Sequence, residues 1–384
     1  MRPVPMTSSI RLGRLFGIEI GFNWSLLFLF ALITWTLAAT VLPQDVPDQS
    51  SLAYWATAVV GALAFYACLL MHELAHAVVA TRKGVKVSGI TFWLFGGVSK
   101  LEGEPSTAGD EALLTVVGPL TSFGLAVLAA VLALGLSATG APALLTDLLT
   151  WLAFLNAGLG LFNLVPAFPL DGGRLLAAFF WWRTGSRPRG VHRAVQVGRI
   201  VAFLMIGLGV AELFLNDVLG GVWIAFIGWF LLAAASAEES ATRARVLLKS
   251  VPVSAAMSAP VVTVPDWLTV EDFLTSVAAR HPFTTYPLYE PSGTLTGVAR
   301  LGDVVRTASS GGQQKRLRDA ARPVAEIPTA RPDEDLETLL ERLGPALDRR
   351  VLVFDGPQLV GILSPADVAR LVILRRALQP TTER

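Results

Sequence analysis

Two histidines and a glutamate occupy a five-residue run inside an apolar segment, His72-Glu73-Leu74-Ala75-His76. Residues i and i+4 share one face of a helix, so both imidazoles can bind one zinc ion. The glutamate beside the first can then take a proton from a water on that ion. Apolar residues flank the run on both sides, and ionisable residues inside a membrane span cost a few kcal/mol each. The cluster therefore predicts a metal site, with Glu73 as its general base.

A catalytic zinc site takes three protein ligands and leaves one position open, so a third ligand must come from elsewhere in the chain. Asp171 is the candidate, because it follows Pro166 and Pro169 and precedes Gly172-Gly173. The prolines interrupt a regular helix and the glycines permit a sharp bend, so the backbone can direct the carboxylate inward. The alternative is that Asp171 caps the helix that begins there.

The elements that must position these residues are membrane helices. The chain has 384 residues, of which 53% are hydrophobic and only 16% charged, a composition typical of membrane proteins. A span needs about 20 apolar residues, and six segments qualify: 22–42, 53–80, 108–137, 148–168, 194–213 and 218–237. The net charge of +1 gives no reason to expect a nucleic-acid partner, and a single cysteine, Cys68, excludes a disulfide framework.

Lysine and arginine are confined to one set of connecting loops, which predicts the orientation because positive residues stay cytoplasmic. The other connections, 43–51, 138–147 and 216–219, have none. We therefore expect a multi-pass protein of the cell membrane with both termini in the cytoplasm. The metal site should then lie nearer the cytoplasmic side.

Residues 84–103 differ from the spans, because apolar residues alternate from Val85 to Leu94 and Gly96-Gly97 marks a turn. This pattern predicts a β-hairpin at the membrane edge, sheltered by protein because an open sheet cannot face lipid. An ordinary amphipathic loop is the alternative.

The last third of the chain has the pattern of soluble α/β protein and contains a repeat. The run Gly297 to Asp303 recurs 64 residues later as Gly361 to Asp367, and each copy is expected to end a strand and open a helix. We predict two domains, 1–250 in the membrane and 251–384 outside it, with repeats at about 252–310 and 320–380.

These residues together resemble the site-2 protease family of intramembrane metalloproteases, in the subgroup with a C-terminal pair of CBS domains. The resemblance covers nearly all of the chain. It is carried by the histidine motif at 72–76, the Gly96-Gly97 hairpin, Gly118-Pro119-Leu120, the segment from Asn163 to Gly173, and the repeat. It implies a polytopic α-helical membrane protein with six spans and a membrane-associated β-hairpin, joined to a soluble α/β tandem CBS domain.

The resemblance also implies one Zn²⁺ per chain, bound by His72, His76 and Asp171, with Glu73 as the base. Asn163 is implied as a polar group near the scissile carbonyl, although an asparagine in a span can also simply tie two helices together. The expected substrate is a single-span regulatory membrane protein such as an anti-sigma factor, cut within its span.

For the CBS pair, the resemblance implies an adenine nucleotide between the repeats. The second copy fits the pattern, with Ser364 placed for phosphate and Asp367 for ribose hydroxyls, whereas the first has Arg300 where Ser or Thr is usual. The alternative is a module that only dimerises.

For the whole chain, the competing functions are an ion transporter gated by its CBS pair and an inactive scaffold. Glu73 beside His72 favours a base over an ion pathway, and all four catalytic positions are present.

Overall fold

The structure is a computed structural model that describes residues 10–15, 17–93, 96–215, 218–343 and 350–378. The chain forms two compact units, Met1–Arg243 and Ala244–Arg384.

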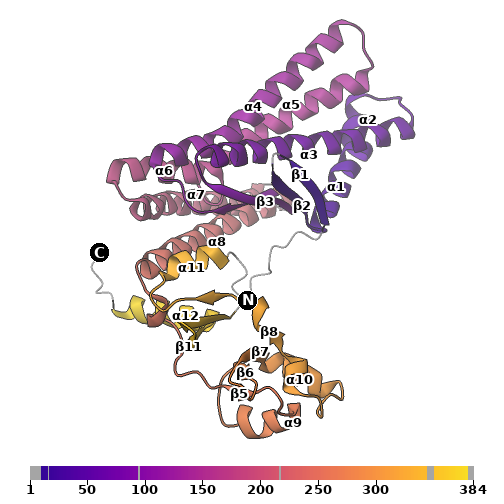
Figure 1. Cartoon of the computed structure of the whole chain (residues 1–384). Helices are drawn as coiled ribbons and strands as arrows, with labels where there is room; N and C mark the ends of the chain where they lie inside the picture. The colour runs from indigo at the N-terminus through magenta and orange to yellow at the C-terminus, as the bar shows by residue number, and fades with distance from the viewer. Residues whose placement is uncertain (1–9, 16, 94–95, 216–217, 344–349, 379–384) are drawn as a thin grey trace. The chain divides into compact units, whose positions relative to one another are not determined.

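Long apolar helices make up most of the first unit (Figure 1). Six are long and apolar enough to cross a bilayer within the described residues: Ser25–Asp45, Ser51–Arg82, Ala108–Ala138, Ala143–Asn163, Arg187–Leu215 and Val218–Leu248. The first comprises α1 (Ser25–Thr36), a π-helical turn (Leu37–Val41) and α2 (Leu42–Asp45), and the others are α3, α4, α5, α7 and α8 in that order. The prediction of six apolar spans is confirmed.

The helix boundaries differ from the expected spans on both sides of Asp171. The expected fourth span ran to residue 168, but α5 ends at Asn163, and the short helix α6 (Asp171–Thr184) then precedes α7. Pro166 and Pro169 explain the early end, because neither can donate the backbone hydrogen bond that a continuing helix needs. The break leaves Asp171 at the first position of α6.

A four-stranded sheet packs against α3. Its strands are β1 (Ile10–Leu15), β2 (Ile18–Phe22), β3 (Lys86–Trp93) and β4 (Gly96–Glu102), in the order β1-β2-β3-β4. The strands β3 and β4 pair antiparallel from Lys86↔Glu102 to Trp93↔Gly96, so the predicted hairpin is confirmed. The strands β1 and β2 were not predicted from the sequence. In β2, Ile18 and Ile20 are buried with Leu69 and Ala77 of α3, and β2 runs parallel to β3.

The second unit contains two α/β repeats. The first has the sheet β5-β6-β7-β8 and the second the sheet β11-β10-β9. The bounds are β5 Val264–Pro265, α9 Val270–Asp272, β6 Thr285–Tyr289, β7 Leu295–Arg300, α10 Leu301–Ser309, β8 Arg322–Pro323, β9 Thr329–Ala330, α11 Leu336–Leu343, β10 Val351–Asp355, β11 Gln358–Leu363 and α12 Pro365–Leu378. Each copy of the repeated run ends a strand and opens a helix, as predicted: β7 leads into α10 and β11 into α12.

Candidate metal centre

Helix α3 presents both histidines of the motif on one buried face. His72 is 2% exposed and His76 is 8% exposed. Their Nε2 atoms lie 3.2 Å apart, which follows from the i, i+4 spacing of the two residues on the helix. The two rings therefore converge on one point inside the bundle.

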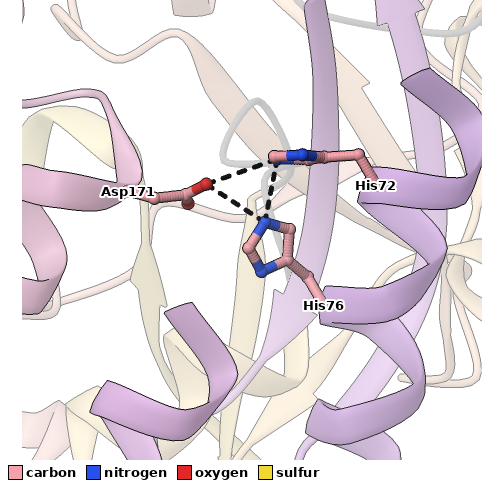
Figure 2. A group of neighbouring side chains, drawn as sticks. All are labelled: His72, His76 and Asp171. Atoms are coloured by element: carbon pink, nitrogen blue, oxygen red, sulfur yellow. Dashed lines mark hydrogen bonds and ion pairs between the residues drawn. The ribbon is translucent and has the colours of Figure 1, made fainter. Parts of the chain in front are cut away.

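Asp171 faces these rings from α6 (Figure 2). Its Oδ2 lies 3.3 Å from Nε2 of His72 and 3.2 Å from Nε2 of His76. The N-cap of α6 is Leu170, and no side chain caps the helix there. The carboxylate thus points at the imidazoles, and the geometry is that of the ligand alternative.

Helix α4 holds the other nitrogen of each ring. Nδ1 of His76 lies 2.6 Å from the carbonyl oxygen of Leu114, and Nδ1 of His72 lies 2.9 Å from Oγ of Ser122. A carbonyl oxygen only accepts hydrogen bonds, so Nδ1 of a neutral His76 carries the proton and its Nε2 presents a lone pair. Such contacts fix the tautomer and orientation of metal-binding histidines.

The donor set fits zinc. Lone pairs of two imidazoles and one carboxylate converge within 3.3 Å of one another, an arrangement that repels itself unless a cation or a proton lies between them. Ligand atoms 2.0–2.1 Å from a tetrahedral zinc are about 3.3 Å apart, close to the separations observed. Two histidine nitrogens and one carboxylate oxygen also leave the fourth position free for water or substrate.

Gly118 of α4 makes room at this point. A methyl group built there would lie 2.1 Å from Nε2 of His76 and 2.7 Å from Nε2 of His72. In the sequence, Gly118 stands out only as part of the run Gly118-Pro119-Leu120. Its packing against both rings depends on how α3 and α4 cross, which no local pattern reveals.

Glu73 lies beside the hairpin. A methyl group built on Gly97 of β4 would come within 2.6 Å of the Glu73 carboxyl carbon and 2.9 Å of its Oε1. The start of β4 is therefore packed directly on the side chain that the sequence assigns as the base.

Asn163, at the end of α5, donates from its amide nitrogen to the carbonyl oxygen of Leu159 at 3.0 Å. This bond holds the amide against its own helix. The role of Asn163 near a scissile carbonyl stays a prediction.

Ser364 and Asp367 lie together at the start of α12. The Asp367 carboxylate accepts from the backbone N–H of Ser364 at 2.9 Å and from its hydroxyl at 2.6 Å, while the Asp367 N–H donates back to the Ser364 hydroxyl at 3.3 Å. The hydroxyl of Ser258 also donates to Asp367, at 2.7 Å. The reciprocal bonds form a capping box, so a structural role accounts for both residues without a ligand.

Two family models match this chain. The model described as "Peptidase family M50" matches residues 60–146 and 138–207, the region that contains the histidines and Asp171. The model described as "CBS domain" matches residues 318–374, in the second repeat.

Curated relatives match along nearly the whole chain. The protein Rip3 of Mycobacterium tuberculosis, named as a zinc metalloprotease, is 43% identical over 376 residues, 98% of this chain and 95% of the relative. A zinc metalloprotease of Methanocaldococcus jannaschii is 28% identical over 369 residues, 95% of this chain and 96% of the relative. A solved structure titled as a site-2 protease from the same archaeon is 26% identical and covers 60% of this chain and 94% of its own, with a TM-score of 0.41.

Proposed function

The chain belongs to peptidase family M50, the site-2 protease family of zinc metalloproteases, and from this premise we propose that it hydrolyses peptide bonds inside the membrane-spanning segments of other proteins. The observation that carries the proposal is the convergence of two histidines and one aspartate within a bundle of apolar helices. The proposed zinc ligands are His72, His76 and Asp171.

The residues around the metal have separate tasks. Zinc, when bound, supplies a Lewis acid that activates water and polarises a carbonyl group. Leu114 and Ser122 keep the lone pairs of the two rings directed at the ion. Glu73 accepts a proton from the attacking water and returns it to the leaving nitrogen, which is the task of a general base and acid.

The substrate enters this arrangement as an extended strand. A helical span hides its peptide bonds, so it must unwind before cleavage, and an unwound segment needs partners for its backbone groups. Strand β4 is the last strand of the described sheet, so it offers an edge for strand addition. Because Gly97 of β4 packs on Glu73, a strand paired there would pass beside the base.

The proposed substrate is a single-span regulatory protein. The proposed orientation places both termini and the CBS pair in the cytoplasm, because lysine and arginine are confined to the loops on that side. Asn163 is proposed as a polar contact for the scissile carbonyl. The side-chain amide nitrogen of Asn163 has two N–H donors, so one can bond Leu159 while the other donates to the scissile carbonyl.

Regulation by an adenine nucleotide is proposed for the second repeat, through Ser364 and Asp367. Binding has to compete with the capping box that these residues form, so it would couple the nucleotide to the start of α12. Calorimetry of the full chain with AMP, ADP, ATP and S-adenosylmethionine, against Asp367→Ala, tests this. Absence of heat with all four would leave the pair as a dimerisation module.

The test of the catalytic proposal is Glu73→Gln in detergent-solubilised protein with a single-span reporter. The amide keeps the shape of the side chain but cannot take the proton, so zinc should be retained while cleavage falls by about 100-fold or more. Asp110→Asn is the control, because Asp110 pairs with Lys83 on the surface of the same unit.

A chelator should abolish cleavage by the wild type, and added zinc should restore it. Cleavage by Glu73→Gln at more than a few per cent of the wild-type rate would reject Glu73 as the base. A wild-type chain that binds no zinc would reject the proposal as a whole.

A further inference from the structure

A buried carboxylate of the first unit lies outside the metal trio and faces arginines from two other helices. Glu111, in the first turn of α4, is 4% exposed. Its Oε1 accepts from Nε and Nη2 of Arg174 on α6, both at 3.0 Å. Its Oε2 lies 3.8 Å from Nη2 of Arg187 at the start of α7, and Nη1 of Arg187 pairs with Glu104 at 2.6 Å. Glu111 therefore joins α4 to both α6 and α7.

Stability is a weak explanation for such a pair. Removing two charges from water costs about as much as their attraction returns, and well-packed apolar side chains often serve equally well. Such a pair does, however, fix the relative positions of its two helices, because loss of the partly exposed Arg174 would leave the buried Glu111 carboxylate without its nearest partner. The contribution of this pair therefore lies in the elements that it positions.

The positions of the pair relative to the metal site supply that reason. Arg174 follows Asp171 by three residues on α6, and Glu111 precedes Leu114 by three residues on α4. Residues three apart are neighbours on a helix surface. On α6 the pair therefore lies next to Asp171, the proposed third ligand. On α4 it lies next to Leu114, whose carbonyl oxygen contacts His76.

Asp171 needs such a tie, because no continuous helix leads into it. It follows the irregular stretch 164–170 between α5 and α6. The next two residues, Gly172 and Gly173, press against that stretch: a methyl group on Gly172 would lie 2.3 Å from the carbonyl oxygen of Leu164. This packing fixes the start of α6 against its own loop. The contact of Arg174 with Glu111 fixes it against α4.

We propose that Glu111 and Arg174 are positioning residues that set the distance between the Asp171 carboxylate and the two imidazoles. The inference rests on the proposed zinc site and adds residues that do not touch the ion. Partners that orient metal ligands typically account for 10–100-fold in metal affinity. Loss of either member of the pair should therefore weaken metal binding by that factor through Asp171.

The experiment measures metal affinity on full-length protein in detergent, by competition with a chromophoric chelator, and records the visible spectrum of the Co²⁺-loaded protein. Glu111→Gln and Arg174→Gln should each bind Zn²⁺ and Co²⁺ 10–100-fold more weakly and alter the cobalt spectrum. Arg174→Lys should be intermediate, since an ammonium cannot reproduce the two guanidinium contacts. Asp110→Asn is the matched control, because it removes the adjacent carboxylate and its pair with Lys83, and it should bind within twofold of wild type.

A double-mutant cycle separates positioning from a merely structural role. If Glu111 acts through Asp171, then Glu111→Gln should change Co²⁺ affinity by no more than twofold in an Asp171→Ala background. A structural role would instead keep its full effect in that background and lower the thermal unfolding temperature of the metal-free chain.

Wild-type affinity in both Glu111→Gln and Arg174→Gln would overturn the inference while leaving the proposed function intact. An equal loss with and without Asp171 would overturn it in the same way. A wild-type chain that takes up neither metal would overturn both proposals.

Discussion

Replacement of Gly118 by alanine should eject the metal. The added methyl group would lie 2.1 Å from Nε2 of His76 and 2.7 Å from Nε2 of His72, close to where the three proposed ligand atoms converge. Gly118 lies inside α4 directly before Pro119, so an added Cβ also meets the proline ring, which disfavours the helical conformation of the preceding residue. The perturbation is steric, and it acts on the two imidazoles and on the adjoining turn of α4.

The size of the effect follows from the distances. Real Cβ atoms essentially never come within 3.0 Å of another heavy atom, so the ring of His76 must retreat by at least 0.9 Å, the difference between 3.0 and 2.1 Å. Metal–ligand distances tolerate only about 0.2 Å. We therefore expect zinc affinity to fall at least 100-fold, about 2.8 kcal/mol.

The assay is zinc content and chelator competition on purified protein, with Gly124→Ala as the matched control. Gly124 lies on the same helix and has no atom within 4 Å of an added methyl group, so its substitution should leave zinc binding unchanged. Full zinc occupancy at unchanged affinity in Gly118→Ala would refute the placement of the ion between these rings.

Three further predictions test the surroundings of the site. Gly97→Ala should keep the zinc but lower proteolysis about 10-fold or more, because the methyl group displaces the carboxyl of Glu73; unchanged turnover would contradict that packing. Ser122→Ala should weaken zinc binding about 10-fold, because Nδ1 of His72 loses its hydrogen-bond partner; wild-type affinity in a metal titration would contradict this. Engineered cysteines in intact cells should react with an impermeant reagent at Asp48 and not at Arg187, and the reverse labelling would invert the topology.

The local parts of the site were predictable from the sequence. The i, i+4 spacing placed His72 and His76 on one helix face without any knowledge of the bundle, and apolar length alone identified six spans. The prolines and glycines around Asp171 predicted a break in the helix but did not decide whether its carboxylate binds a metal or caps a helix. Only the position of α6 against α3 distinguishes them, and that position depends on contacts between residues about one hundred apart in the chain.

The strands β1 and β2 were missed for a similar reason. Ile18, Ile20 and Phe22 alternate as a strand should, but the segment is short and directly precedes a strong apolar span, so the alternation alone does not distinguish it from that span. Its partner β3 begins more than sixty residues later, after the whole of α3, and the pairing is parallel. A pairing of that separation leaves no local signal of register.

Helix α4 contributes no proposed zinc ligand, yet its residues contact His72 and His76 directly and contact Asp171 through its neighbour Arg174. Along it, Glu111 holds the arginine that follows the proposed third ligand, Leu114 accepts from His76, Gly118 leaves the space between the rings, and Ser122 contacts His72. These positions recur every three or four residues, so they form one face of the helix. Substitutions along this face should therefore change metal affinity, whereas a substitution on another face, such as the one at Gly124, should not. A ligand set supplied by two helices is in this way aligned by a third.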